Sequence, residues 1–404
     1  MSKRPILLLL IAVIAIGGLI FGISRLQSAN AVEYSADVIV QLNSNNIEGF
    51  ARANDVREFK FPQDFGAHPE YQTEWWYYTG NLATSEDRRF GFQLALFRRA
   101  ITPTMPERSS EWASNQVYFG DFALTNVGDN QFFATNRFSR GAAGLSGASV
   151  DPRFHVWVED WSVTALNDDA SQLRIKAQGE TAQGTYAIDL TTTRNKPLVF
   201  HGEKGLSRKN ADVGNASYYF SQTRLITEGT ITINGQNFAV KGSSWMDQEF
   251  STSVLGKDAV GWDWFALQLD NQREIMLFYI RMADGSIEPL SKGTLVEADG
   301  STTTLNLEDY KIEVLDHWLS PRTGANYPSG WRIQINASSG VIALEVQPLI
   351  KDQELNSVTA YWEGASRITG TDNGQPVTGY GYVEMTGYNH ATSGERGGSA
   401  NLGN

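Results

Sequence analysis

The 404-residue chain contains no cysteine and only five histidines. The lack of cysteine excludes disulfide bonds, thiol catalysis and thiolate metal sites. The histidines, at positions 68, 155, 201, 317 and 390, are scattered and do not have the spacing of metal ligands. No glycine-rich phosphate loop and no serine nucleophile elbow is present either. We therefore expect no metal and no cofactor.

Basic residues are also scarce, with 33 Lys and Arg against 45 Asp and Glu and a net charge of −12. Because Lys and Arg drive binding to phosphates, nucleic acid is not an expected partner. What the chain does contain is 38 Gly, 11 Trp, 15 Tyr and 20 Phe. This composition favours a turn-rich β protein over a helical one.

The N-terminus has the features of a targeting segment. Lys3 and Arg4 precede an uncharged apolar run from Ile6 to Ile23, and the sequence at 29–31 fits the small-residue rule for signal cleavage. The run also reaches membrane-spanning length, so residues 1–31 are either a signal peptide or a membrane anchor helix. Both predict the periplasm or the extracytoplasmic face of a bacterial inner membrane, with membrane contact only if the segment is not cleaved.

Four consecutive aromatic residues, Trp75 to Tyr78, follow the carboxylate of Glu74. In a β-strand, successive side chains point to opposite faces. Glu74, Trp76 and Tyr78 should therefore share one face, and Trp75, Tyr77 and Thr79 the other. Since neither face suits water, we expect one to lie on a packed core and the other on an aromatic cavity.

Two segments share one pattern: an aromatic strand, a charged turn, an apolar strand and an arginine. They are residues 74–98 and 262–281, and we interpret them as equivalent hairpins that open two similar β-domains. Short strands separated by Gly, Asn and Asp turns fill the rest and indicate barrels or sandwiches. The predicted organisation is a tether (32–58), an N-terminal domain (59–256), a C-terminal domain (257–390) and a disordered tail (391–404).

Segments His68–Leu82, Gly242–Phe250, Tyr361–Gly364 and Gly379–Tyr388 resemble those of a known family. It is the carotenoid 1,2-hydratase (hydroxyneurosporene synthase) family, with its AttH-like, lipocalin-like relatives from ABC-transporter operons. The resemblance covers roughly residues 48–390. It implies an all-β fold of two lipocalin-like (calycin) antiparallel β-barrels packed together. Barrels of this size can hold one apolar ligand, and the resemblance also implies an ABC transporter of the envelope as a partner.

Asp247 is the leading candidate for catalysis because Trp245 lies two residues before it and Tyr218 upstream. Hydration of a C=C bond needs an acid that protonates carbon, and burial among aromatics keeps a carboxyl protonated. The resemblance implies that this aspartate is the proton donor, with Trp245 and Tyr218 as helpers. The hydratases carry a histidine and a tyrosine nearby, where this chain has other aromatics. The alternatives are an aspartate that caps a turn or pairs with Arg224.

Further residues are expected to line the ligand cavity: Glu74, Trp76, Tyr78, Gln93, Tyr219, Trp262 and Trp264. A buried carboxylate needs a partner, and Arg98 or Gln93 could supply one for Glu74. His68 is expected to be a hydrogen-bonded structural residue at the entry to the first strand.

Three functions stay open on sequence alone. The leading one is an exported protein that binds a long apolar molecule, such as a lipid, isoprenoid or polyketide. The second is a cofactor-free hydro-lyase of the same shape that uses Asp247 as its acid. The third is a β-sandwich that binds carbohydrate through exposed aromatics.

Overall fold

The computed structural model describes residues 47–388, apart from 106, 108, 253–255, 257 and 357–359. These residues belong to one compact unit. The predicted signal or anchor segment, most of the tether, His390 and the tail lie outside the described residues. The regular elements of the described part of the chain are β-strands and two short 3-10 turns, η1 (Gln63–Phe65) and η2 (Leu307–Asp309). None of its helices has the length and apolar character needed to cross a membrane.

Thirteen strands form the first sheet, in the order β4-β3-β2-β1-β13-β12-β9-β8-β7-β6-β5, with β10 and β11 paired to β12. The bounds are β1 (Thr73–Ala83), β2 (Arg89–Ala100), β3 (Gln116–Asn126), β4 (Gln131–Arg140), β5 (Ser146–Ser149), β6 (His155–Val158), β7 (Trp161–Ala165), β8 (Gln172–Thr181), β9 (Gly184–Arg194), β10 (Val199–Phe200), β11 (Leu206–Arg208), β12 (Ala216–Ile233) and β13 (Gln236–Ser251).

The second sheet has ten strands, in the order β17-β16-β15-β14-β25-β24-β22-β21-β18, with β23 paired to β24; β19 and β20 form a separate hairpin. The bounds are β14 (Ala259–Leu269), β15 (Glu274–Met282), β16 (Lys292–Val296), β17 (Thr302–Asn306), β18 (Tyr310–Val314), β19 (His317–Leu319), β20 (Asn326–Pro328), β21 (Trp331–Ala337), β22 (Gly340–Pro348), β23 (Glu354–Asn356), β24 (Ala360–Asp372) and β25 (Gln375–Met385).

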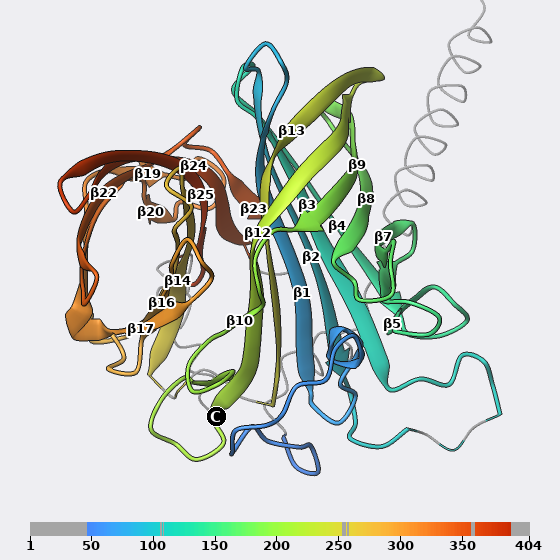
Figure 1. Ribbon diagram of the computed structural model, residues 1–404. Coiled ribbons are helices and arrows are strands. Elements are labelled where there is room, and N and C mark those ends of the chain that lie inside the picture. Colours follow the sequence, from blue (N-terminus) through green and yellow to red (C-terminus); the bar gives the residue numbers. More distant parts are fainter. Residues whose placement is uncertain are drawn as a thin grey trace, which may run out of the picture. The chain divides into compact units, whose positions relative to one another are not determined.

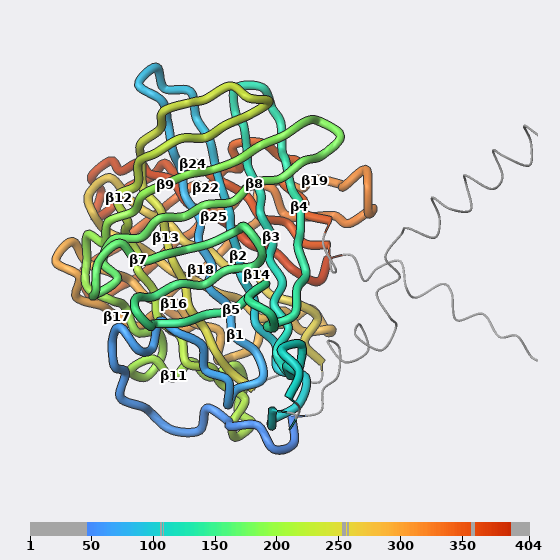
Figure 2. The backbone as a smooth tube through the Cα atoms, turned by 90° about the vertical axis from the view of Figure 1, so that its right-hand side faces the viewer, coloured from blue at the N-terminus to red at the C-terminus, as the bar shows by residue number. Residues whose placement is uncertain are grey.

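Both sheets are antiparallel and curl into nearly closed barrels. Figure 1 shows the strands of the second sheet arranged as a ring. In the first barrel β4 contacts β8, and Figure 2 shows β7, β8 and β9 crossing the direction of β1 to β4. The predicted all-β fold of two lipocalin-like barrels is therefore confirmed.

Local sequence explains the hairpins. Asn234 and Gly235 join β12 to β13 with φ angles of 50° and 79°, and Asn373 and Gly374 join β24 to β25 with 52° and 77°. Asn-Gly is the pair that tolerates positive φ at both centres of a two-residue turn. The two hairpins predicted from the shared pattern are also present, as β1–β2 and β14–β15.

Strand β1 shows the predicted alternation. Trp76 and Tyr78 lie in the packed core of the first barrel. Trp75 and Tyr77 face the other way, into an aromatic cluster that also contains Trp264 of β14. The outer face of the first barrel is thus buried against the second barrel.

Glu74 is fully buried at the start of β1 and has charged partners. Its Oε2 accepts a bond from Arg98 Nε at 3.1 Å, and its Oε1 lies 2.7 Å from His68 Nδ1 and 3.0 Å from Gln248 Nε2. Although burial alone would raise the pKa of Glu74, the charges of His68 and Arg98 hold it below its usual value. The predicted Arg98 partner is confirmed, and His68 is hydrogen-bonded at this strand entry as expected.

Removal of the Glu74 charge should destabilise the fold strongly. Glu74→Gln leaves Arg98 buried without its counter-ion, so the free energy of unfolding should fall by about 3 kcal/mol. Urea unfolding followed by tryptophan fluorescence measures this change. Asp189→Asn is the matched control, because it breaks an exposed pair with Arg174 and should have far less effect. Equal losses in the two variants would contradict a structural role for Glu74.

Candidate functional site

The two barrels pack through the outer faces of their sheets. One buried cluster is shared by β1, β2, β12 and β13 of the first sheet and by β14, β15, β24 and β25 of the second. Its largest members are Tyr77, Tyr219, Trp245, Trp264 and Tyr382. We call this cluster the interface cluster. Since its aromatic rings surround several carboxyl groups, it has the features expected of a reactive site.

Asp247 lies in this interface and accepts three hydrogen bonds. The indole of Trp245 donates to Oδ1 at 2.6 Å, and the Ser221 hydroxyl donates to the same oxygen. The Tyr219 hydroxyl contacts Oδ2 at 2.7 Å and itself accepts a bond from Trp264 Nε1 at 3.1 Å. All of these donors are neutral, so the carboxyl is held firmly without a counter-charge.

This environment changes the acidity of the group. Burial raises the pKa of Asp247 from 3.8 to about 7, although the hydrogen bonds from Ser221, Tyr219 and Trp245 act to lower it. Its side chain is 4% exposed, and the nearby Glu249 carboxylate raises the pKa further. Asp247 can therefore hold a proton near neutral pH, as a general acid must.

A hydrogen-bond chain continues from Asp247 to the second barrel. His201 Nε2 lies 2.7 Å from Ser221 Oγ, and His201 Nδ1 lies 2.8 Å from Thr294 Oγ1. Because the Ser221 proton is used on Asp247, the bonding pattern assigns the proton of His201 to Nε2. Burial and the charge of Lys209 lower the pKa of His201 to about 3, so the ring stays neutral. The chain fixes Ser221 without adding charge.

The wall of the second barrel carries two further acids. Glu363 Oε2 accepts a bond from the Tyr77 hydroxyl at 2.9 Å, and Glu384 Oε1 accepts one from Trp262 Nε1 at 3.2 Å. Burial and the charge of Glu384 raise the pKa of Glu363 well above its usual value. Burial, together with the charges of Asp247 and Glu249, raises the pKa of Glu384 to about 8.

One margin of the interface is apolar and partly open to solvent. Trp75, Phe97, Trp262 and Met282 are half-buried there and pack against the interface cluster. We call these four residues the aromatic margin. Glu249, opposite Trp75 in the β1–β13 register, forms a 2.6 Å ion pair with Lys209 at this margin.

The structure brings together five of the predicted site residues: Asp247, Trp245, Tyr219, Trp262 and Trp264. Gln93 also faces the second barrel, 3.5 Å from the Tyr361 hydroxyl. Four others lie elsewhere. Glu74 is buried at the start of β1, where it bonds to Arg98 and His68. Trp76 and Tyr78 are inside the first barrel, and Tyr218 points away from Asp247 and donates to the Asp55 carbonyl at 2.7 Å.

Strand alternation explains the position of Tyr218. It neighbours Tyr219 in sequence, so the two rings lie on opposite faces of β12. The alternative of an Asp247–Arg224 pair is wrong, because Arg224 bonds to Glu274. Sequence reasoning missed Ser221, His201 and Thr294, which no local pattern links. Glu363 and Glu384 lay inside family segments, and alternation with Tyr361 and Tyr382 was the signal that could have identified them.

Metal ligation has no support in the part of the chain that the structure describes: no group of three His, Asp or Glu side chains there could hold an ion. The buried carboxyl groups of the interface are bonded mainly to hydroxyl and indole donors. The arrangement suits proton transfer to an apolar molecule.

Comparison with solved structures shows the same fold in several proteins. An AttH protein of Nitrosomonas europaea is 31% identical, with a TM-score of 0.72, and the match covers 84% of this chain and 100% of that one. Kievitone hydratase from Nectria haematococca is 17% identical, with a TM-score of 0.60 over 84% and 98% of the two chains. CghA is 10% identical, with a TM-score of 0.51 over 84% and 96%. The last two show the fold alone.

A search of curated protein sequences found no match. The family model described as AttH-like matches residues 52–388, which include both barrels and every residue of the interface cluster. The resemblance seen in the sequence segments is thereby confirmed at the level of the family. The chain belongs to the AttH-like family.

Proposed function

We propose that this protein is a cofactor-free acid catalyst that protonates a C=C bond of an apolar ligand, in the manner of a hydro-lyase. The observation that supports this most strongly is Asp247, a buried carboxyl with a pKa near 7 that is held by neutral donors, among them the indole of Trp245. Kievitone hydratase shares the fold, and its name describes a hydration.

The hydrogen bonds indicate where the proton leaves. Oδ1 of Asp247 already accepts bonds from Trp245 and Ser221, so the acidic proton belongs on Oδ2, which faces the Tyr219 hydroxyl. Tyr219 also accepts from Trp264, and its own proton is then free to point into the site. The proton reaches the ligand from Oδ2 directly or through Tyr219.

Aromatic faces around the acid would stabilise the cation that forms. Tyr77 and Trp264 meet edge to face with their centroids 5.3 Å apart, and the Trp245 and Trp264 centroids lie 6.3 Å apart. A desolvated cation gains about 1–2 kcal/mol from each such face. The same rings exclude bulk water, which strengthens every charge interaction inside.

The aromatic margin is the proposed entry for the ligand. Glu249 pairs with Lys209 at this margin, and Asp247 lies two residues along β13 from Glu249, further into the interface. Lys209 Nζ also lies 5.6 Å from the Tyr219 ring and 5.1 Å from the Phe278 ring. Displacement of the Lys209 side chain would expose the route to Tyr219 and Asp247.

The proposed setting is the extracytoplasmic side of a bacterial inner membrane. Lys3, Arg4 and the apolar run that follows support export, by cleavage or by anchoring. An isoprenoid, lipid or polyketide exchanged with an ABC transporter would suit both the setting and the apolar site.

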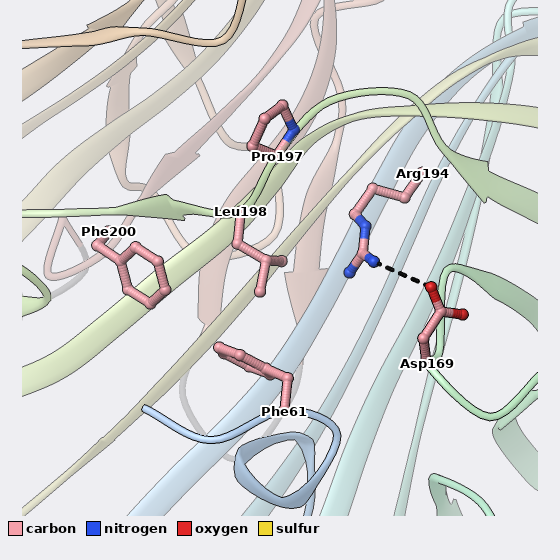
Figure 3. Close-up of a pocket in the computed structure, with 6 residues that line it drawn as sticks. All are labelled: Phe61, Asp169, Arg194, Pro197, Leu198 and Phe200. Carbon is pink, nitrogen blue, oxygen red and sulfur yellow. Dashed lines mark ion pairs between the residues drawn. The ribbon is translucent and has the colours of Figure 1, made fainter. Parts of the chain in front are cut away.

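A second candidate function is ligand carriage without turnover, and a cavity away from Asp247 favours it. This cavity of about 390 Å³ is lined by Phe61, Pro197, Leu198 and Phe200, with the Arg194–Asp169 ion pair at its edge. Figure 3 shows the two phenyl rings and Leu198 on one side and the Arg194 guanidinium on the other. An apolar tail with an anionic head would match this lining.

Asp247→Asn should abolish proton transfer to a substrate. We expect wild-type protein in D₂O to place deuterium on carbon in at least one of farnesol, squalene and oleic acid, and the variant to place at least 100-fold less. Mass spectrometry measures the label. Asp263→Asn is the matched control, because Asp263 is a buried carboxyl that pairs with Arg281 away from the site. No label with the wild type, or equal label with Asp247→Asn, would refute the proposal.

Asp247→Asn should also stabilise the protein at alkaline pH. An Asn amide can donate to Tyr219 while its oxygen keeps the other two bonds, so it mimics the neutral acid. The folded pKa of about 7 exceeds the unfolded 3.8, so wild-type stability should fall between pH 4 and 7. The variant should be more stable at pH 8 by on the order of 3 kcal/mol, and equally stable at pH 4. Urea unfolding at both pH values decides this.

If the protein is a carrier, substitutions in the cavity should weaken ligand binding and Asp247→Asn should not. Binding of the fluorescent fatty acid cis-parinaric acid should weaken at least tenfold in Arg194→Ala and Phe200→Ala, and remain unchanged in Asp247→Asn. Arg174→Ala is the control for loss of a surface charge, since Arg174 is exposed on the neighbouring β8. If Asp247→Asn alone weakens binding, the interface holds the ligand and the cavity does not.

A further inference from the structure

Six residues of the interface form a closed ring that spans both barrels. Asp247 is directly opposite Tyr77 in the β1–β13 register, and the Tyr77 hydroxyl bonds to Glu363. Glu363 is directly opposite Glu384 on β25, and Glu384 is opposite Trp264 on β14. Trp264 bonds to Tyr219, which bonds to Asp247 and closes the ring.

The ring places carboxyl groups on both walls around one aromatic contact, Tyr77 against Trp264. Residues directly opposite in antiparallel strands have Cβ atoms about 5 Å apart. Glu384 and Trp264 are therefore direct neighbours across the β14–β25 pair. Trp264 in turn donates its indole hydrogen bond to Tyr219, which bonds to Asp247. A ligand at this contact would have an acid on each side.

We propose that Glu384, supported by Glu363, is the second catalytic carboxyl of this site and removes a proton from the attacking water while Asp247 protonates the C=C bond. This inference rests on the proposed function and extends it by naming the base and by assigning it to the other barrel. The substrates of the site are then an apolar alkene and water.

The polar atoms of Glu363 are satisfied unequally. Glu363 is 0% exposed. Its Oε2 bonds to Tyr77, whereas its Oε1 has no hydrogen-bond partner among the residues that the structure describes. A buried polar atom without a partner is costly, so Oε1 fits a site that is completed by water or ligand. Glu384 beside it is half-buried, at the aromatic margin next to Trp262, where water can arrive.

The reaction balances with these groups alone. The π electrons of the alkene take the Asp247 proton and form a C–H bond, which leaves a cation on the adjacent carbon. A water oxygen forms the C–O bond, and its excess proton passes to the Glu384 carboxylate. Transfer of that proton back to Asp247 restores the pair, so the net change is addition of H₂O. The active form holds one proton between the two carboxyls.

Other charges face the pair and belong in any analysis of its titration. Glu249 on β13 and Asp121 on β3 act on Glu384, as does Asp247. Glu363 lies opposite it in register. Lys209 is a cation at the margin and is paired with Glu249, and His201 is neutral behind Ser221.

A double-mutant cycle tests the pairing without any substrate. Asp247→Asn and Glu384→Gln should each raise the urea midpoint of unfolding at pH 9, where both wild-type carboxyls are ionised and repel each other. The double variant should raise the midpoint by less than the sum. At pH 5 both folded carboxyls are protonated, so the effects should add. Additive effects at both pH values would show that the groups do not interact and would overturn the inference.

Isotope labelling tests the division of roles. With the alkene probe that wild-type protein labels, Glu384→Gln should lose about 100-fold of the ¹⁸O incorporated from H₂¹⁸O. It should keep deuterium incorporation from D₂O within a few-fold, because Asp247 still protonates carbon. The cation can then return a different proton from an adjacent carbon to the Asp247 carboxylate, which re-forms a C=C bond and leaves the deuterium on carbon. Glu345→Gln on the exposed face of β22 is the control and should change neither label.

The two possible failures are distinguishable. Wild-type protein that labels no alkene contradicts the proposed function and, with it, the second acid. In the other case, the wild-type protein labels an alkene but the Glu384→Gln variant loses both labels equally or loses neither. Asp247 then remains the acid, and Glu384 has no part in the chemistry.

Discussion

Burial of Asp247 between two barrels is the constraint on which the site depends. The outer face of a single barrel would be open to water, and a carboxyl there would ionise. Packing of the second barrel on that face removes the water, and the donors that bond to Asp247 within the described part of the chain are all neutral. The pKa of about 7 is the result of this packing. Association of the two barrels therefore creates the acid.

Comparison with Glu74 shows how the partners decide the outcome. Both carboxyls are buried, and both lie on adjacent strands of the same sheet. Glu74 is bonded to Arg98 and His68, whose charges keep its pKa low and make it part of the framework. Asp247 is bonded to a serine, a tyrosine and an indole. Counter-charges stabilise the ionised form of Glu74, whereas burial without a counter-charge favours the neutral form of Asp247.

Most of what could be predicted from the sequence follows from the alternation of side chains along β-strands. The two hairpins, the double burial of β1 and the importance of Asp247 follow from short patterns and from the family segments. Which face of β1 meets the site could not be predicted, because both faces are aromatic, and the sequence therefore does not separate Trp76 and Tyr78 from the residues around Asp247. The Ser221–His201–Thr294 chain joins three distant segments, and its existence depends on the packing of two sheets.

Infrared absorption of the Asp247 carboxyl tests the central claim most directly. Protein with ¹³C-labelled aspartate side chains, compared with the same protein carrying Asp247→Asn, isolates the band of a protonated aspartic acid. We predict that this band is present at pH 6 and disappears as the pH rises through about 7. Absence of the band at pH 6, with Asp247 already ionised, would contradict the account.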